Sequence, residues 1–485
     1  MEAASQSQSA YCGNRFPLAG ALSVLLALAS GLTLRLWMLK QFFDLDGDSL
    51  VYGSLAKNLL LHGRYALSGD GGVLAPTLIR LPGYPLFLAL CFRLFGMENY
   101  VSAAWVQIAL ELAGCLLLAD FARRIAPAPL GAGAAHCTLW LAALCPFTAV
   151  YAAQPMTEAL TCFAIALALW SAARFRARPG WAAALLFTFA VTMAALLRPD
   201  GALVAVALAP ALLMGLGREP GDSSISSKKL ARMAVVCVLL ALMPFAAWGW
   251  RNWQVFHVFQ PLAPPRATDP GESYDPGWDR WVRSWCLDFV CTSEIVWNVP
   301  EGPLEVGKLP ARAFDSPAQY AETAGLAAAY NVNKKLTPEI DARFGKLADE
   351  RIAAHPLRYY LWLPLGRMAD MWLRPRVENL PIELDWWNYS AHEDETCISW
   401  AYAGLNALYL LLGVAGMWLR PRLWWAMLAY ILMRSAMLTT FASTETRYTL
   451  ECFPMLFALG GIALYRLTRT VLLSVLKVKA SGGRG

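Results

Sequence analysis

Residues 43–52 read Phe-Asp-Leu-Asp-Gly-Asp-Ser-Leu-Val-Tyr and place three carboxylates in five positions, directly after a long apolar run. A charge beside hydrocarbon is costly, so charged residues at a membrane border usually have a function. Further along, Arg80-Leu81-Pro82-Gly83-Tyr84-Pro85 places a cation before a rigid proline turn. Together, the acidic cluster, the cation and the turn indicate an enzyme that acts on a substrate held in the bilayer.

The composition around this stretch is that of a polytopic, all-α membrane protein. Hydrophobic residues make up 57% of the chain and charged residues 16%. The apolar residues gather in runs of about twenty, the length that crosses about 30 Å of hydrocarbon. We expect the first run to be an uncleaved helix, because no small-residue cleavage site precedes it. Ten spans are predicted, near residues 16–36, 100–120, 132–152, 158–174, 181–197, 201–217, 232–250, 399–418, 423–441 and 451–467.

The basic residues predict how these spans are oriented. If the N-terminus is inside, Arg123, Arg174, Lys228 and Arg420 all lie in inner connections, whereas the outer loops carry few cations. This pattern favours a multi-pass protein of a bacterial plasma (inner) membrane with its active site facing the periplasm or outside. The same topology explains the basic clusters, so nucleic acid is not expected as a partner.

The chain divides into three predicted parts. Residues 1–250 form a transmembrane core whose first outer loop, 40–99, carries the acidic cluster. Residues 251–398 form a mainly helical periplasmic insert, because the segment is too long for a simple loop. Residues 399–485 contain the closing spans and a basic cytoplasmic tail. Residues 84–96 are apolar but too short to span, so we expect a short helix on the outer surface.

Local signals within the insert predict its helices. Thr337-Pro338-Glu339 has a capping hydroxyl, a proline at the first helical position and an early acid, which is typical of a helix start. Pro356 should end that helix. The aromatic segment 357–372 is expected to lie at the membrane interface. Cys286 and Cys291 could form a disulfide in an oxidising compartment, which the sequence leaves open.

Two carboxylates are the candidate catalytic groups. Asp48 and Tyr52 are four residues apart and share one face of a predicted helix. Capping of that helix would explain Asp48 alone, but it would not explain Asp44 and Asp46. Glu158 follows Pro155-Met156-Thr157 at the outer end of the fourth span, where an acid capped by Thr157 is the structural alternative.

Several arginines lie at the outer ends of spans, where the orientation rule does not explain them: Arg80, Arg198, Arg251 and Arg447. A guanidinium group matches the oxygen atoms of a phosphate, so these residues indicate a phosphate-bearing ligand. Glu445 could instead pair with Arg447 at a wet surface. Arg434 lies inside a span, and the sequence offers no account of it.

A cofactor is not required by any pattern. The five histidines have no ligand spacing, and no nucleotide-binding loop is present. Asp46 and Asp48 could hold Mg²⁺ or Mn²⁺, but their spacing permits an ion without demanding one.

The motifs in this order resemble those of the GT-C class of membrane glycosyltransferases. The similarity is greater to the branch containing protein O-mannosyltransferases and the lipid A aminoarabinose transferase. It covers about residues 16–250 and, more thinly, 350–467. It rests on Asp48-Ser49-x-x-Tyr52, Arg80-Leu81-Pro82-Gly83-Tyr84-Pro85, Pro155-Met156-Thr157-Glu158, His355-Pro356-Leu357-Arg358-Tyr359 and Arg447-Tyr448 followed by Pro454.

The resemblance implies a GT-C fold, a polyprenyl-phosphate-linked sugar donor and an acceptor on the outer side. Asp48 would be the catalytic carboxylate and Glu158 a second acid near the sugar. Arg80, where aminoarabinose-type relatives carry lysine, would hold the lipid phosphate together with Arg447. The remaining substrate-binding residues are expected to be Tyr52, Tyr84, Arg198 and Tyr448. Ser49 departs from the commoner Asp-Glu pair.

The acceptor could be a protein, a lipid or an envelope glycan. A transporter or flippase of lipid-linked sugars is the second function class, and a non-catalytic scaffold is the third. The spans are nearly charge-free at their centres, which favours an enzyme over a transporter.

Overall fold

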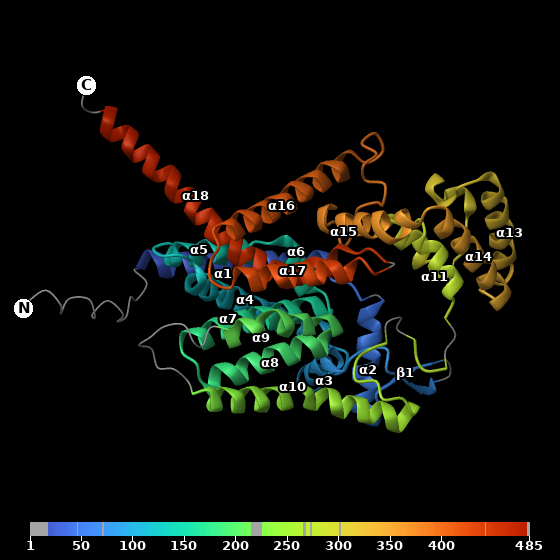
Figure 1. Ribbon diagram of the computed structural model, residues 1–485, viewed down its shortest axis with the longest axis horizontal. Coiled ribbons are helices and arrows are strands. Elements are labelled where there is room, and N and C mark those ends of the chain that lie inside the picture. Colours follow the sequence, from blue (N-terminus) through green and yellow to red (C-terminus); the bar gives the residue numbers. More distant parts are fainter. Residues whose placement is uncertain are drawn as a thin grey trace, which may run out of the picture.

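The computed structural model describes residues 18–45, 47–69, 72–214, 226–264, 268–271, 274–299, 302–441 and 443–482. Figure 1 shows an elongated bundle of helices with a smaller helical unit at one end. The bundle consists of α1 (Leu18–Phe42), α4 (Tyr100–Ile125), α5 (Gly131–Ala143), α6 (Pro146–Ala153), α7 (Thr157–Ala177), α8 (Trp181–Leu197), α9 (Leu203–Met214), α10 (Ser227–Phe256), α16 (Glu393–Trp418), α17 (Trp424–Leu438) and α18 (Phe453–Gly482).

Each predicted span coincides with an apolar helix or helix pair, so the chain is a multi-pass, all-α membrane protein. Within the described residues, six helical stretches are long and apolar enough to cross a membrane: α1, α4, α7, α10, α16 and the stretch that contains α18. The pair α5 and α6, bent by 52°, makes a seventh. The other three predicted spans correspond to the shorter apolar helices α8, α9 and α17.

The bend between α5 and α6 has an identifiable cause. Pro146 begins α6 and has no N–H to donate, so the hydrogen-bond ladder is interrupted there. The side chain of Arg35 in α1 fills the break by donating to the carbonyl oxygens of Ala143 (2.7 Å) and Ala142 (3.5 Å). Arg35 also forms a buried ion pair with Glu111 of α4. The expectation of span centres nearly free of charge is therefore wrong for Glu111, which lies near the middle of the predicted span 100–120.

Small residues allow the bundle helices to approach one another closely, as is usual in membranes. α4 packs between α5 and α7, and α18 packs against α5 and α16. A methyl group at Gly416 would collide with the carbonyl of Leu459, and one at Gly461 would collide with Thr138. This packing fixes the helix ends, from which the site described below is built.

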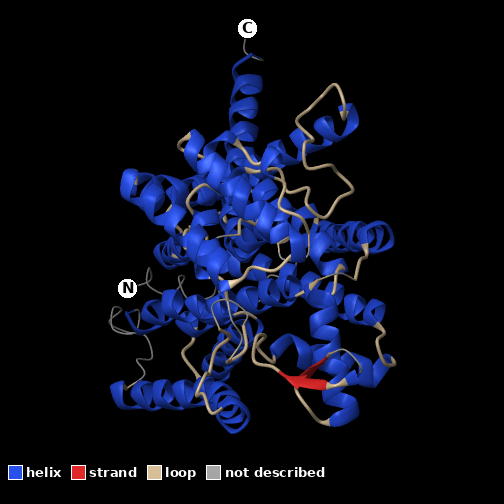
Figure 2. Ribbon diagram, turned by 90° about the vertical axis from the view of Figure 1, so that its right-hand side faces the viewer, coloured by secondary structure: helices blue, strands red, loops and turns tan. Residues whose placement is uncertain are grey.

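The loop that follows α1 folds into a compact unit at one end of the bundle (Figure 1). It contains α2 (Asp48–His62), the antiparallel strands β1 (Ala66–Ser68) and β2 (Leu74–Pro76), drawn in red in Figure 2, and α3 (Gly83–Phe95). Arg251 of α10 ties this loop down by donating to the carbonyls of Tyr65 (2.6 Å) and Thr77 (2.8 Å). Arg251 therefore serves the fold of the loop and does not join the other outer arginines.

The insert has a hydrophobic core of its own. It contains α11 (Pro276–Arg283), α12 (Phe289–Cys291), α13 (Pro317–Asn333), α14 (Pro338–Ala354) and α15 (Leu363–Leu373). Trp281, Trp285 and Phe344 are among its fully buried side chains.

The local predictions for the insert agree with the structure. The hydroxyl of Thr337 caps α14 by accepting from the N–H of Ile340 (3.3 Å), and α14 ends just before Pro356. The disulfide between Cys286 and Cys291, left open by the sequence, is present. Residues 356–373 are helical, while their location at a membrane interface stays a prediction.

Candidate functional site

Asp48 occupies the first position of α2, where Gly47 adopts a positive φ of 48° and turns the chain into the helix. Its carboxylate accepts a hydrogen bond from Arg80 at 2.6 Å on one oxygen atom and from Arg447 at 3.3 Å on the other. Two arginines that are far apart in the sequence thus flank a single carboxylate. The three side chains are only partly buried, with exposed fractions of 24% for Asp48, 27% for Arg80 and 16% for Arg447.

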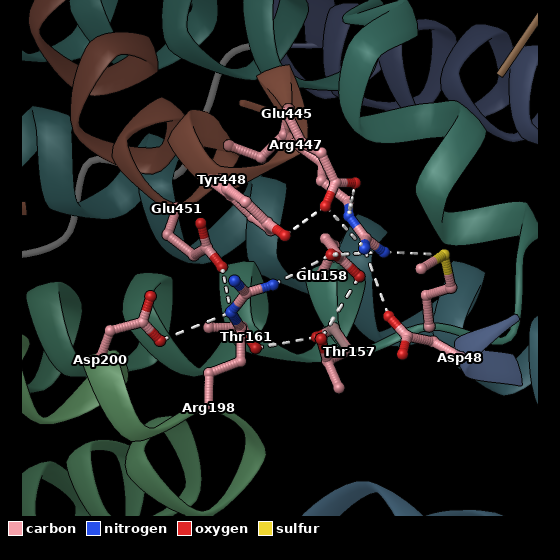
Figure 3. A network of polar contacts seen from close by, with 12 residues as sticks. Asp48, Thr157, Glu158, Thr161, Arg198, Asp200, Glu445, Arg447, Tyr448 and Glu451 are labelled. Carbon is pink, nitrogen blue, oxygen red and sulfur yellow. Dashed lines mark hydrogen bonds and ion pairs between the residues drawn. The ribbon is translucent and has the colours of Figure 1, made fainter. Parts of the chain in front are cut away.

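Glu158, at the second residue of α7, lies immediately behind this group. Its side chain is 1% exposed, and one carboxylate oxygen lies 3.0 Å from Arg198 and 3.8 Å from Arg447. Figure 3 shows Glu158 between these two arginines. Thr157 donates to the other oxygen of Glu158 at 3.3 Å and makes no capping hydrogen bond to the helix. Because Glu158 links two cations of the site, helix capping does not account for it.

A second row of charges pairs with Arg198. Arg198 lies 3.1 Å from Glu451 and 3.5 Å from Asp200. Arg434 of α17 pairs with the same two acids, at 2.5 Å and 2.6 Å. These ion pairs form an alternating chain of charges from Arg434 to Asp48, and Figure 3 shows its part from Asp200 and Glu451 to Asp48. This explains the arginine that the sequence left unexplained, because a buried charge is tolerated where it is paired on several sides.

The predicted tyrosines lie at different depths. The guanidinium of Arg80 lies 6.0 Å from the ring centroid of Tyr52. Tyr448 of the 3₁₀ segment η7 (Thr446–Cys452) has two arginines, Arg198 and Arg447, over its ring at 5.4 Å and 5.5 Å. Tyr84 is fully buried, and its hydroxyl donates to Gln107 at 2.5 Å. The hydroxyl of Tyr84 is therefore used inside the fold, and its contact with substrate stays a prediction.

The electrostatic environment keeps Asp48 ionised. Burial by itself raises the pKa of the Asp48 carboxyl, but the nearby guanidinium groups of Arg80 and Arg447 outweigh it and hold this pKa below its usual value. The Nε of Arg80 is buried and has no hydrogen-bond partner among the described residues. The site therefore holds a fixed carboxylate and a cation whose donors are not all used.

The environment of Glu445 differs from the one that the sequence predicts. It does pair with Arg447, at 2.5 Å, and it also accepts from Tyr448. However, its side chain is only 8% exposed, so the pair lies inside the site and not at a wet surface. Glu445 fixes the guanidinium of Arg447 beside Asp48.

The surroundings of Asp48 do not fit a divalent cation. Each of its oxygen atoms already faces a guanidinium group, and a metal ion would be repelled by both arginines. Among the residues that the structure describes, no group of three His, Cys, Asp or Glu side chains could hold a metal ion. Asp46, the other expected ligand, lies outside the described residues.

Sequence reasoning missed Glu451 and Asp200, which complete the second row. A local signal was available for Glu451, since Tyr448 and Glu451 are three residues apart and share a face of a helical turn. No local signal exists for the contact between Asp200 and Arg434, which are 234 residues apart in the chain.

Comparisons with known proteins agree with this picture. Residues 79–248, which include Arg80, Glu158 and Arg198, match the family described as dolichyl-phosphate-mannose-protein mannosyltransferase. A search of curated proteins finds no match by sequence.

Among solved structures, an oligosaccharyltransferase of Archaeoglobus fulgidus, tethered to an acceptor peptide with an NVT sequon, shares the fold at a TM-score of 0.50 and 13% identity. The alignment covers 96% of this chain and 52% of that protein, so the chain spans about half of its length. ArnT from Cupriavidus metallidurans, bound to undecaprenyl phosphate, aligns at a TM-score of 0.40 and 15% identity, over 93% of this chain and 79% of that one.

The architecture is thus that of the GT-C fold, as the sequence motifs predicted. The family match covers residues 79–248, and the solved structure shares the fold with this chain.

Proposed function

We propose that this protein is a membrane glycosyltransferase that moves a hexose or pentose from a polyprenyl-phosphate donor to an acceptor. The observation that carries the proposal is the carboxylate of Asp48 held between Arg80 and Arg447 at the end of the bundle. The description of the matching family, which names dolichyl-phosphate-mannose, supports a lipid-phosphate donor. The acceptor is a protein, a lipid or an envelope glycan.

The position of the site supports an outer-face reaction. Asp48, Arg80 and Arg447 gather where α7 begins, whereas Arg123 of α4 and Arg174 of α7 lie at the opposite ends of their helices. Positive charge concentrates on the cytoplasmic side of membrane proteins. The cluster would therefore face the periplasm of a bacterial inner membrane.

The reaction needs cations more than it needs covalent catalysis. The acceptor oxygen attacks the sugar carbon that carries the phosphate, and the bond from that carbon to the phosphate oxygen breaks. Its electron pair leaves with the polyprenyl phosphate, which gains one negative charge. Arg80 and Arg447 would stabilise this growing charge, and groups aimed at developing charge supply a large share of catalysis.

Asp48 would accept the proton that the acceptor loses. In the ligand-free site its pKa is lowered by the same arginines that would bind the phosphate. When the donor's phosphate takes over Arg80 and Arg447, the partly buried carboxylate loses its partners, so its pKa rises and it becomes a stronger base. Glu158 would hold Arg198 and Arg447 in place and remain the second acid beside the sugar.

The test compares envelope glycolipids and glycoproteins by mass spectrometry in a deletion strain that expresses wild-type protein, Asp48→Asn or Asp44→Asn at matched levels. Asp44 is exposed in the same loop and serves as the control. Asp48→Asn should remove one sugar modification, reduce transfer about 10²–10⁴-fold and allow its polyprenyl-phosphate donor to accumulate. Full restoration by Asp48→Asn would overturn the carboxylate mechanism and favour transport or scaffolding.

A further inference from the structure

A small pocket lies beside the site and shares the segment η7 with it. Phe147 and Tyr151 of α6 form one wall. Arg376, Glu378 and Asn379, from the linker that follows α15, form another, and Thr446 closes the pocket next to Arg447 in the chain. None of these residues has a role in the reaction proposed above.

Glu378 is the polar group that this pocket leaves unsatisfied. One of its carboxylate oxygens accepts from the hydroxyl of Thr446 at 2.8 Å. The other is buried and has no hydrogen-bond partner among the described residues, and its nearest cation, Nε of Arg374, is 3.7 Å away. The side chain is only 10% exposed. A buried acceptor without a partner costs about 1–3 kcal/mol, so it is commonly completed by a ligand or water.

The neighbouring cations decide which group fits. All three guanidinium nitrogens of Arg376 already donate, to Asn406, to the carbonyl of Thr446 and to Thr449. The guanidinium of Arg376 is therefore held in place and gives this side of the pocket a positive charge. Together with Arg374 it would repel an ammonium group, whereas a neutral hydroxyl can donate to the free oxygen of Glu378.

We infer that this pocket receives one hydroxyl group of the donor's sugar, with Glu378 as the acceptor of its hydrogen bond. The inference rests on the proposed function, because Arg447 would hold the phosphate to which that sugar is attached. Thr446, which lines the pocket, directly precedes Arg447, so the pocket lies next to the segment that carries the phosphate-binding guanidinium.

The experiment measures binding of four lipids to the purified full-length protein: undecaprenyl phosphate alone, and its mannose, glucose and 4-amino-4-deoxyarabinose derivatives. The quantity of interest is the affinity gained by adding each sugar to the bare lipid phosphate. For wild-type protein, mannose or glucose should raise the affinity about tenfold or more, while the aminosugar should raise it less.

Glu378→Gln, which keeps an acceptor oxygen, should retain part of that gain, and Glu378→Leu should abolish it, with binding of bare undecaprenyl phosphate unchanged in both variants. Glu383→Gln, an exposed carboxylate in the same linker, is the matched control. Thermal unfolding of each variant checks its folding. If both Glu378 variants kept the full affinity gained from the sugar, this inference alone would be overturned. It would also be overturned if the variants lost as much affinity for bare undecaprenyl phosphate as for the sugar-bearing lipids. If wild-type protein did not bind undecaprenyl phosphate, the proposed function would fail as well.

Discussion

Two arginine–carboxylate groups in this molecule look alike in sequence but differ in how their hydrogen bonds are used. Arg35 is fully buried, and it donates to Glu111 and to backbone carbonyls at the break between α5 and α6. Arg80 is partly exposed, contacts Asp48 and keeps a buried Nε without a partner among the described residues. The first group is saturated by the fold, and the second is not.

This difference separates a structural charge from a ligand-binding one. Because Arg35 repairs a broken helix, removing its partner should damage folding. Among the described residues, Arg80 and Asp48 make no hydrogen bond to the backbone of a bundle helix, so their geometry can be exchanged for contacts with a ligand. Incomplete pairing at a partly open site is thus a more useful sign of function than charge alone.

The largest expected effect is on the saturated pair. Glu111→Ala leaves Arg35 buried without its counter-ion and should lower the free energy of unfolding by about 3–5 kcal/mol. Thermal unfolding of the protein in detergent measures this loss. The double variant Arg35→Met with Glu111→Leu removes both charges and should lose less. A stability within about 0.5 kcal/mol of wild type for Glu111→Ala would contradict the structural role.

Substitutions of Arg80 and Arg447, which flank Asp48, should instead have their main effect on ligand binding. Arg80→Gln or Arg447→Gln should weaken binding of undecaprenyl phosphate about 10–100-fold, since a hydrogen bond to a charged group contributes about 1.5–3 kcal/mol. The melting temperature should change little for Arg80→Gln, whereas Arg447→Gln should also lower it, because Glu445 and Glu158 are buried and would lose a counter-ion. Arg80→Lys should keep most of the affinity, because it preserves the charge. Equal affinity of all variants, measured at low salt, would remove phosphate binding from this site.

Asp370 is a buried acid whose nearby cation does not offset the effect of burial on its pKa, so the stability of the protein should depend on pH. Burial raises the pKa of Asp370 in α15 from 3.8 to about 6. The folded state thus binds the proton more tightly than the unfolded state, and stability should fall as pH rises from about 4 to about 6.

Asp370→Asn should abolish that fall and add about 1–2 kcal/mol of stability at pH 7.5, with little change at pH 4. An asparagine oxygen can still accept from the N–H of Phe289, as Asp370 does at 3.1 Å. Unfolding curves at the two pH values provide the comparison. A pH-independent difference between the proteins would mean that Asp370 keeps an ordinary pKa.

The smallest effect belongs to an exposed pair in the insert. Arg343 and Glu322 lie 2.6 Å apart, with exposed side-chain fractions of 53% and 41%. Glu322→Gln should change the free energy of unfolding by less than about 1 kcal/mol, because water screens the interaction. A loss as large as that of Glu111→Ala would show that pairing geometry, and not burial, sets the energy of these ion pairs.

Much of the fold could be read from local sequence. Run length and composition predicted the apolar helices, and the hydroxyl–proline–acid pattern at Thr337 predicted the start of α14. The acidic cluster predicted that a helix begins at Asp48. These features depend on neighbouring residues and on the thickness of hydrocarbon, so no distant contact is needed to recognise them.

The sequence predicted which residues form the candidate site, but not which of them contact one another. Asp48, Glu158, Arg80, Arg198 and Arg447 were all named from the sequence, because each interrupts an apolar border without a topological reason. Their pairing, the burial of Glu445 and the second row of charges were not foreseen. Sequence spacing does not specify which cation a carboxylate meets when the two come from different helices.

The sequence by itself determined that this chain is a multi-pass helical membrane protein with charges at one set of helix ends. Only the tertiary structure decided that Arg35 serves the fold, that Arg434 supports Arg198 through Glu451, and that one oxygen of Glu378 is buried without a hydrogen-bond partner among the described residues. The physical reason is that hydrophobicity and helix caps act over a few residues, whereas the partner of a buried charge is chosen by packing between helices far apart in the chain.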